Sequence, residues 1–233
     1  MNIHAIVLCG GKAKRLGVIS RNFPKCLLEI NKKPFIFYFL DNLIESGIMK
    51  ITLCTGYLHE EIERVVGHSY RSTTIDYSRE FSSLGTGGAV KKACKNDQKE
   101  WRLILNGDSF CPFNLNSQRF IQKKSPLIFV HKVNDISRYG EIKFNDNHLI
   151  VSFEEKNNKT HGGFINAGIY WLPSNVFNSH PSDTFISMER EILPSLIGKL
   201  HAEICDRGFI DIGTPESYRE AEDFFAIYDN IKL

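Results

Sequence analysis

The chain has 233 residues, with 29 basic and 27 acidic side chains and a formal net charge of +2 at pH 7. This length fits one α/β-sized domain and is too short for two large ones. The near balance of charge excludes a broadly basic surface of the kind that binds nucleic acid or an anionic membrane, so any affinity for phosphate must be local.

Neither the cysteines nor the apolar segments point to secretion or membrane insertion. Most of the six cysteines lie in apolar surroundings, without C-x-x-C pairs, so we expect small buried hydrophobes in a reducing cytoplasm. The apolar start has no basic region ahead of it, unlike a signal peptide, and no apolar run approaches the roughly 18 residues of a membrane span. We therefore expect a cytoplasmic protein that uses neither a membrane nor a nucleic acid as a partner.

The first half of the chain predicts alternating strands and helices. Strands are expected at 3–8, 51–55, 74–78 and 102–106, and helices at 34–47, 59–66 and 86–95. Such alternation is typical of parallel strands with right-handed crossovers and helices on both faces of the sheet. Because ligands of these sheets lie off the carboxyl ends of the strands, the loops after residues 8, 78 and 105 should converge on one crevice.

The second half predicts mainly strands separated by short polar turns. Strands are expected at 126–132, 141–144, 149–155, 165–172 and 202–205, and helices at 187–199 and 215–228. No internal repeat, low-complexity tract or linker interrupts the chain, so we do not expect a separate second domain.

The first predicted strand ends in a glycine-rich, basic turn, Cys9-Gly10-Gly11-Lys12-Ala13-Lys14-Arg15-Leu16-Gly17. Paired glycines let backbone N–H groups approach phosphate oxygens closely, and the three basic side chains add positive charge where a triphosphate carries negative charge. The alternative is an ordinary turn with a solvated basic edge, which is the better interpretation of a Gly-Gly pair taken alone.

Two aspartates stand where polar chemistry is expected. Asp108 follows the buried strand at 102–106, and Asp211 lies among apolar residues just before a helix that begins near Pro215. Capping of a turn or helix is the alternative role for both. If the fold brings them together, Mg²⁺ bridging a triphosphate is the natural occupant, because this ion prefers few carboxylates plus phosphate oxygens.

Several polar residues at strand boundaries suggest a sugar pocket. Glu155 and Lys156 end one predicted strand, and Asn166 lies near the start of another. Solvated charges, turns and bulges are the ordinary interpretation of such positions. The functional alternative is that Glu155 and Asn166 bind sugar hydroxyls while Lys156 meets a phosphate.

Taken together, the pattern resembles the sugar-1-phosphate nucleotidyltransferases, also called nucleoside-diphosphate-sugar pyrophosphorylases, over nearly the whole chain. The segments that carry the resemblance are Leu8–Gly11 with Arg15–Leu16, Phe23–Lys25, Leu84–Ala89, Leu105–Asp108, Phe153–Lys156, Asn166–Tyr170 and Asp211–Pro215. The resemblance implies a Rossmann-like three-layer α/β/α nucleotidyltransferase fold with a mixed, mostly parallel central sheet. It also implies a single domain over 1–233, in which approximately 1–115 bind the nucleotide and 116–233 bind the sugar phosphate.

Within the family, the sequence is most similar to those of the guanylyltransferases that act on D-glycero-α-D-manno-heptose 1-phosphate and supply GDP-heptose for bacterial surface polysaccharide. The implied reaction is an in-line attack of a sugar 1-phosphate oxygen on the α-phosphorus of a nucleoside triphosphate, with release of pyrophosphate. Positioning two anions and neutralising charge carry most of this chemistry, so we expect no serine or cysteine to act as a nucleophile.

The resemblance also implies roles for individual residues. Catalytic roles fall to Arg15, Lys25, Asp108 and Lys156, and Asp108 and Asp211 would hold Mg²⁺. The residues implied to bind the nucleotide are Leu8, Cys9, Gly10, Gly11, Lys12, Lys14, Arg15, Lys25, Glu80, Leu84, Gly85, Thr86 and Gly107. Those implied to bind the sugar phosphate are Tyr139, Gly140, Glu155, Lys156, Asn166 and Gly168.

Glu80 favours GTP as the nucleotide. An ionised carboxylate only accepts hydrogen bonds, which suits the N1–H and N2–H₂ edge of guanine and opposes the carbonyl oxygens of uracil. CTP and UTP stay open as alternatives, as do mannose 1-phosphate and other sugar 1-phosphates. The assembly is left open between a monomer and a homodimer.

The sequence departs from the family pattern at two places, and further alternatives to the family's activity are weighed against it. Ala13-Lys14 stands where the family usually has Gly-Thr, and the resulting sequence Gly-Gly-Lys-Ala-Lys-Arg is similar to that of the molybdenum-cofactor guanylyltransferases, which stay open as an alternative. Asn157 stands where the family usually has a proline after the lysine that corresponds to Lys156. A non-catalytic nucleotide-sugar sensor is the alternative from another class. A dinucleotide-dependent oxidoreductase is excluded, because Gly10-Gly11 lacks the following G-x-x-G spacing.

Overall fold

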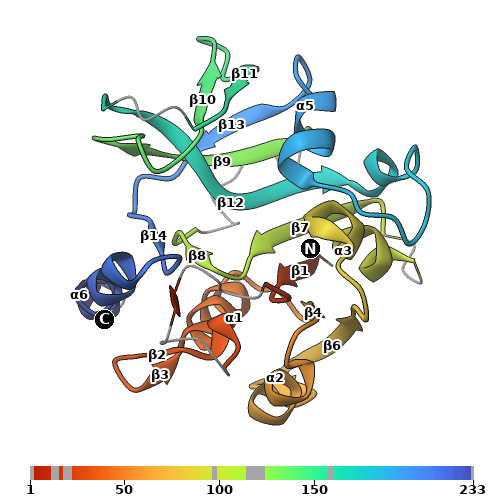
Figure 1. Cartoon of the computed structure of the whole chain (residues 1–233), viewed down its shortest axis with the longest axis vertical. Coiled ribbons are helices and arrows are strands. Elements are labelled where there is room, and N and C mark those ends of the chain that lie inside the picture. The colour runs from red at the N-terminus through yellow and green to blue at the C-terminus, as the bar shows by residue number, and fades with distance from the viewer. Residues whose placement is uncertain are drawn as a thin grey trace.

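The computed structural model describes residues 3–11, 16–17, 23–95, 99–113, 124–156 and 160–231. Within them, ten strands form one sheet: β1 (His4–Leu8), β4 (Lys50–Thr55), β5 (Ser69–Tyr70), β6 (Thr73–Arg79), β7 (Trp101–Asn106), β9 (Leu127–Val133), β10 (Glu141–Phe144), β11 (Ile150–Glu154), β12 (Gly163–Pro173) and β13 (His201–Ile204). The strand order is β11-β10-β12-β7-β1-β4-β6-β5, with β9 paired to β12 and β13 paired to β9 (Figure 1). The sheet therefore runs through both halves of the chain.

The two halves of the sheet differ in strand direction. β1 pairs in parallel with β4 and β7, and β4 pairs in parallel with β6. The long strand β12 is antiparallel to β7, β9 and β10, while β13 runs parallel to β9. The predicted mixed sheet is confirmed, and its parallel core lies in the first half, where strands and helices alternate along the chain.

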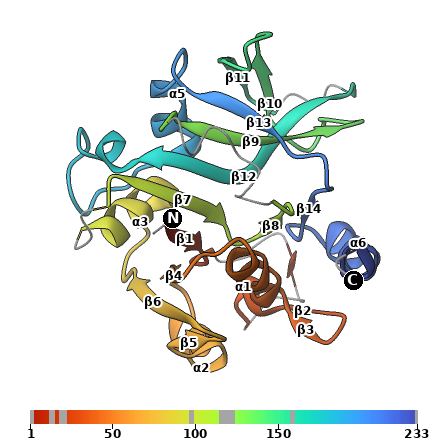
Figure 2. The ribbon, with the colours of Figure 1, turned by 180° about the vertical axis from the view of Figure 1, so that it is seen from behind.

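Helices cover both faces of the parallel core. Alternate residues of β1 point to opposite sides: Ala5 and Val7 pack with α1 (Phe35–Glu45), α2 (His59–Val66) and α6 (Pro215–Ile231), whereas Ile6 packs with α3 (Gly85–Cys94). α1 ends where Gly47 takes a φ of +80°, a left-handed conformation that glycine adopts without strain. Figure 2 shows α1 and α6 on the same side of the sheet, and the result is the expected three-layer α/β/α architecture.

Very short elements escaped the sequence prediction. They are the hairpin of β2 (Glu29–Ile30) and β3 (Lys33–Pro34), the antiparallel pair of β8 (Ser109–Phe110) and β14 (Ile210–Asp211), and the 3₁₀ turns η2 (Lys25–Leu27) and η4 (Ser174–Phe177). Two-residue strands contain too few residues to show a periodic pattern. β8 and β14 nevertheless lie side by side in both views and position the candidate site (Figures 1 and 2).

The helix predicted over 187–199 is confirmed only over 188–195. A π-helical turn, η5 (Met188–Ile192), leads into one short α-helical turn, α5 (Leu193–Ser195), and the helix goes no further. Pro194 has no N–H for the helical hydrogen-bond ladder, and Gly198 takes a left-handed φ of +81°. These two residues explain why the helix stops early.

The expectation that the cysteines are reduced is wrong for one pair. Cys111 and Cys205 form a disulfide between the segment after β8 and the segment after β13. Their sequence separation of 94 residues hides this proximity, which only the fold creates. Cys9, Cys26 and Cys54 are free and buried, in line with the expectation. None of the described helices has both the length and the apolarity needed to span a bilayer.

Candidate functional site

The loops that follow β1, β4, β6 and β7 line one cavity of about 800 Å³. All four loops leave the carboxyl ends of parallel strands, which is why they meet at one edge of the sheet. The predicted residues that line the cavity are Leu8, Cys9, Gly10, Gly11, Lys25, Glu80, Gly107 and Asp108. Lys12, Lys14 and Arg15 lie outside the described residues.

Seven further lining residues were not predicted from the sequence: Cys26, Gly56, Tyr57, Phe81, Ser82, Ser83 and Gly213. Tyr57 follows β4, and Phe81, Ser82 and Ser83 follow Glu80 in the loop after β6. The signal that was available for Phe81 is an aromatic residue among polar ones, directly beside Glu80 and just before a glycine-rich helix start.

The residues Leu84, Gly85 and Thr86 are not among those that line the cavity. The hydroxyl of Thr86 donates to Glu189 (3.0 Å) and accepts from the backbone N–H of Met188 (2.9 Å). Gly85 has a φ of +70°, and a Cβ there would come within 2.5 Å of the carbonyl oxygen of Ile186. These contacts fasten the start of α3 to the first turn of η5 and to the residues just before it, and the nucleotide-binding role of the three residues stays a prediction.

Gly107 joins the two central strands where both end. Its N–H donates to the carbonyl of Leu8 (2.9 Å), and a Cβ would come within 2.5 Å of the same oxygen. A side chain at this position would push β1 and β7 apart. The close approach places Asp108 directly beside the glycine-rich loop.

Lys25 and Asp108 form an ion pair at the cavity wall. The Lys25 ammonium lies 2.9 Å from Oδ2 of Asp108; the lysine side chain is 10% exposed and that of the aspartate 47%. Lys25 begins η2, directly after Pro24. A lysine this deeply buried requires a charged partner, and Asp108 provides it while keeping much of its own carboxylate open to the cavity.

The strand pair β8–β14 brings Asp211 next to the chain segment that carries Asp108, although Asp211 itself does not line the cavity. Asp211 stands opposite Ser109, and the N–H of Ile212 donates to the carbonyl oxygen of Asp108 (3.0 Å). Oδ2 of Asp211 accepts from the phenol of Tyr139 (3.0 Å), and Oδ1 accepts from the N–H of Gly213 (2.5 Å).

These residues fit a hard divalent cation. Asp108 lines the cavity, as does Gly213, the hydrogen-bond partner of Asp211. Within the described parts of the chain, no group of three or more His, Cys, Asp or Glu side chains is placed to hold a metal ion. Protein ligands would thus be few, and phosphate oxygens and water would complete the shell, which is the arrangement that Mg²⁺ prefers.

The residues predicted to bind the sugar phosphate divide into two groups. Tyr139 contacts Asp211, and Gly168 packs against β8, where a Cβ on it would come within 2.6 Å of Ser109 Oγ. Glu155 and Lys156 are exposed just after β11 and do not line the cavity.

Asn166 and Gly140 shape the backbone of the same region. The Asn166 side chain accepts from the N–H of Gly168 and donates to the hydroxyl of Tyr170, both at 2.9 Å. A Cβ on Gly140 would come within 2.7 Å of the carbonyl oxygen of Glu154, so β10 and β11 depend on a glycine here. A role for either residue in binding sugar stays a prediction.

Two titratable groups in the cavity have altered proton affinity. A hydrogen bond with Cys26, followed by burial, raises the pKa of the Cys9 thiol, so Cys9 is not a reactive thiolate at neutral pH. Burial raises the pKa of Glu80, although the N–H of Leu84 donates to its Oε2 (2.9 Å) and opposes that shift. Glu80 therefore binds its proton more tightly than an exposed glutamate does.

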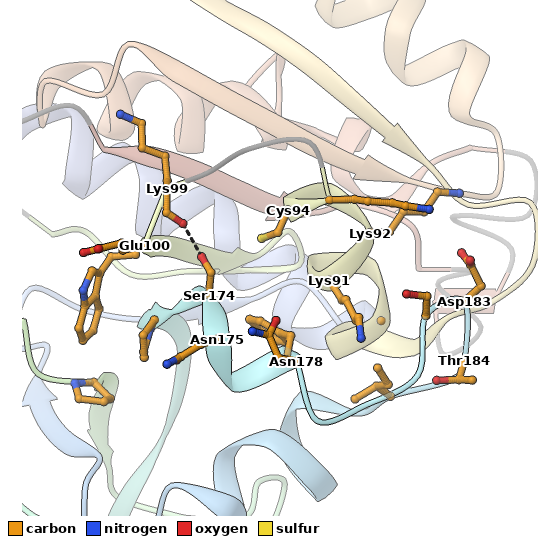
Figure 3. A pocket seen from close by; sticks show the side chains of 18 of the residues that line it. Lys91, Lys92, Cys94, Lys99, Glu100, Ser174, Asn175, Asn178, Asp183 and Thr184 are labelled. Carbon is orange, nitrogen blue, oxygen red and sulfur yellow. Dashed lines mark hydrogen bonds between the residues drawn. The ribbon is translucent and has the colours of Figure 1, made fainter.

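A second cavity, of about 790 Å³, lies between α3 and η4, away from the carboxyl ends of the parallel strands (Figure 3). Three of its five lysines are already engaged: Lys91 donates to the carbonyl of His180, Lys92 donates to that of Arg79, and Lys124 pairs with Glu100. The hydroxyl of Ser174 donates to the carbonyl of Lys99, as the dashed line marks. The Lys25–Asp108 ion pair and the glycine loop of the first cavity are absent from the residues that line this one.

Comparisons with known proteins agree with this geometry. Residues 4–226 match the model of a family described as nucleotidyl transferase. The chain is 38% identical over 218 residues to a D-glycero-alpha-D-manno-heptose 1-phosphate guanylyltransferase from Campylobacter jejuni, with 93% of this chain and 97% of that one covered. A protein of the same name from Aneurinibacillus thermoaerophilus is 36% identical over 225 residues, with 94% and 97% covered. Among solved structures, HddC from Yersinia pseudotuberculosis complexed with GMP-PN has a TM-score of 0.84 at 31% identity, with 96% of this chain and 99% of that one covered.

Proposed function

The chain belongs to the nucleotidyl transferase family, and on that basis we propose that it transfers a guanylyl group from GTP to D-glycero-α-D-manno-heptose 1-phosphate. The products are GDP-D-glycero-α-D-manno-heptose and pyrophosphate. The family and the three-layer fold predicted from the sequence are confirmed. The relatives are named for an enzyme activity that joins a nucleotide to a sugar 1-phosphate.

The observation that carries the proposal is the Lys25–Asp108 ion pair at the wall of one cavity, with Asp211 on the strand that pairs with β8 directly after Asp108. A buried ammonium and two carboxylates suit a triphosphate, because the ammonium neutralises phosphate charge and the carboxylates hold a divalent cation. Enzymes of this family generally use a divalent metal. We infer that Mg²⁺ is the metal here and that Asp108 and Asp211 hold it; when bound, it neutralises charge on the phosphates.

The residues present support a direct transfer without a covalent enzyme intermediate. Cys9 lines the cavity, but its raised pKa keeps the thiol protonated. Lys25 is held by Asp108 and is positioned to bind phosphate oxygens rather than to attack phosphorus. The sugar phosphate oxygen is then the nucleophile, and holding both anions in line supplies much of the rate enhancement.

Glu80 supports guanine as the base. It lines the cavity beside Gly10, with Oε1 3.7 Å from where a Cβ on Gly10 would lie. Two relatives are named guanylyltransferases, and a similar solved protein is complexed with GMP-PN. A carboxylate acceptor suits the two donors of guanine.

We further propose that the chain works as one domain, with approximately 1–115 binding GTP and 116–233 binding the heptose phosphate. The continuous pairing of β7 with β12 supports this division of one sheet, as does the pairing of β8 with β14 across the two halves.

The experiment that tests the function measures pyrophosphate release with Mg²⁺ across a matrix of four nucleoside triphosphates and several sugar 1-phosphates. The heptose 1-phosphate with GTP should give the highest kcat/KM. A clear preference for UTP or dTTP would overturn the guanylyl assignment. Release with no pair at all would favour a protein that binds nucleotide sugars without turning them over.

A further inference from the structure

Phe81 is an aromatic side chain left open to solvent at the wall of the catalytic cavity. Its side chain is 89% exposed, the largest exposed fraction among the large hydrophobic residues described, and it lines the cavity beside Glu80. Covering a phenylalanine is favourable, so one that stands beside a ligand cavity gains stability when a ligand covers it. The position of Phe81 therefore points to a flat, apolar ligand group.

The surroundings of Phe81 indicate which face of the ring receives that group. The Lys92 ammonium lies over the ring, 5.6 Å from its centroid, and the same ammonium donates to the carbonyl of Arg79 (2.6 Å). A cation fixed on one face leaves the opposite face for a second partner. Tyr57, on the loop after β4, adds another partly exposed aromatic ring to the lining.

The cavity wall also indicates which part of the substrate reaches Phe81. Apart from Gly213, its lining residues belong to the first half of the chain, and the residues predicted to bind sugar are absent from it. Lys25 and Asp108 mark the position of the phosphates, and Glu80 carries the carboxylate suited to guanine. Phe81 is the next residue after Glu80 and so stands with the base rather than with the phosphates.

We propose that Phe81 stacks on the nucleobase of the bound nucleoside triphosphate, an inference that rests on the proposed function. Glu80 and Phe81 then divide the recognition of the base between them. Glu80 chooses among bases through its hydrogen bonds, whereas stacking is tolerant of sequence because every base has a π-face. Loss of Phe81 should weaken the binding of all nucleoside triphosphates by a similar factor and leave the order of their affinities unchanged.

The test measures equilibrium binding in the absence of sugar phosphate, with Mg²⁺ present. The ligands are GTP, UTP and tripolyphosphate, which has the phosphates without a base. Phe81→Ala should bind GTP and UTP about tenfold more weakly, the effect expected for one lost base-aromatic stack, and should bind tripolyphosphate as the wild type does. Phe81→Tyr should restore the affinity for both nucleotides.

Met49→Ala is the matched control, because Met49 is 58% exposed and directly precedes β4, at the opposite end of that strand from the cavity. It should leave all three affinities unchanged. The proposal is overturned if Phe81→Ala binds GTP as tightly as the wild type does. It is also overturned if the affinity of this variant for tripolyphosphate falls by the same factor as its affinity for GTP, which would indicate a general change in the loop. It is also overturned if this variant changes only the elution volume in size-exclusion chromatography, which would assign Phe81 to an interface between copies of the chain.

Failure of this proposal and failure of the proposed function are distinguishable. Binding is measured without turnover, so the effect of Phe81→Ala is decided even if no pair of substrates releases pyrophosphate. Conversely, a wild-type protein that makes GDP-heptose while Phe81→Ala retains full affinity for GTP keeps its function and loses only the stacking role.

Discussion

The phenol of Tyr139 donates a hydrogen bond to Oδ2 of Asp211 at 3.0 Å, and within the second half of the chain this contact joins the β9–β10 connection to β14. Tyr139 lies between β9 and β10, and Asp211 ends β14 beside Asp108. Burial, with a smaller contribution from the charge of Asp211, raises the pKa of the phenol, so it remains a donor at neutral pH. The sequence analysis placed Tyr139 with the sugar phosphate, whereas the structure also connects it to a candidate metal ligand.

Tyr139→Phe should weaken metal binding more than sugar binding. Without the phenol, Asp211 loses one of two partners on Oδ2; it keeps the Arg138 guanidinium, 3.5 Å from the same oxygen, and the N–H of Gly213 on Oδ1. We expect the metal concentration for half-maximal activity to rise about tenfold, the effect typical of losing a partner that orients a metal ligand. Added Mn²⁺ should also raise the melting temperature of the variant less than it raises that of the wild type. A raised KM for the sugar phosphate with an unchanged metal requirement would instead assign Tyr139 to the sugar alone.

Glu80→Gln should reduce the preference for GTP and remove a pH dependence. Burial raises the pKa of Glu80 above its ordinary value of 4.5, so as the pH falls the carboxylate becomes protonated earlier than an exposed one. Protonation removes acceptor capacity toward guanine, and the KM for GTP in the wild type should therefore rise as the pH falls through that raised pKa. The variant should show a flatter KM profile and a GTP/UTP ratio lowered by about tenfold or more. An unchanged ratio would exclude Glu80 from base selection.

Gly168→Ala should destabilise the protein more than a matched glycine substitution. Gly168 has a φ of +77°, and a Cβ would come within 2.6 Å of Ser109 Oγ and 3.0 Å of Asn106 Cβ. Strain and overpacking together should lower the free energy of unfolding by about 2–4 kcal/mol. Gly198 has a similar φ of +81° but nothing within 4 Å, so Gly198→Ala should cost only about 1–2 kcal/mol. Equal losses in urea denaturation would contradict the packing of β12 on β8.

The Cys111–Cys205 disulfide should stabilise the protein. A cross-link between residues 94 positions apart restricts the unfolded chain, and its loss should lower the free energy of unfolding by about 2–4 kcal/mol. Denaturation with and without reductant measures this difference, and a Cys111→Ser/Cys205→Ser variant should be insensitive to reductant. Thiol titration of the unfolded, unreduced protein should find the four remaining cysteines. Six titratable thiols would show that the bond is absent.

The long elements of the first half could be predicted because each shows its own pattern. The apolar run of β1 alternates between two buried faces, and α1 carries both an apolar side and a terminating glycine. The segment over 187–199 has helical apolar spacing throughout but is helical only over 188–195, because Pro194 lacks an N–H for the hydrogen-bond ladder and Gly198 takes a left-handed φ. Local pattern thus predicts an element well only where no single residue disrupts it.

The arrangement of the site could be predicted only in part. The glycine loop, Lys25 and Asp108 lie at positions that a parallel sheet brings to one edge, so their convergence follows from the topology. The meeting of Asp211 with Asp108 depends on the two-residue strands β8 and β14, which show no pattern in the sequence. Thr86 sits in a motif that resembles a nucleotide-binding one, yet its hydroxyl contacts Met188 and Glu189, and that long-range packing appears only in the fold.

We propose that Asp108, paired with Lys25 at the cavity wall, serves the transfer of a guanylyl group from GTP to the heptose 1-phosphate. The most direct measurement compares pyrophosphate release from this substrate pair, with Mg²⁺, by the wild type and by Asp108→Asn. The wild type should turn over, and the variant should lose activity by about a hundredfold or more while circular dichroism shows an intact fold. Normal turnover in Asp108→Asn would contradict a role for Asp108 in the transfer.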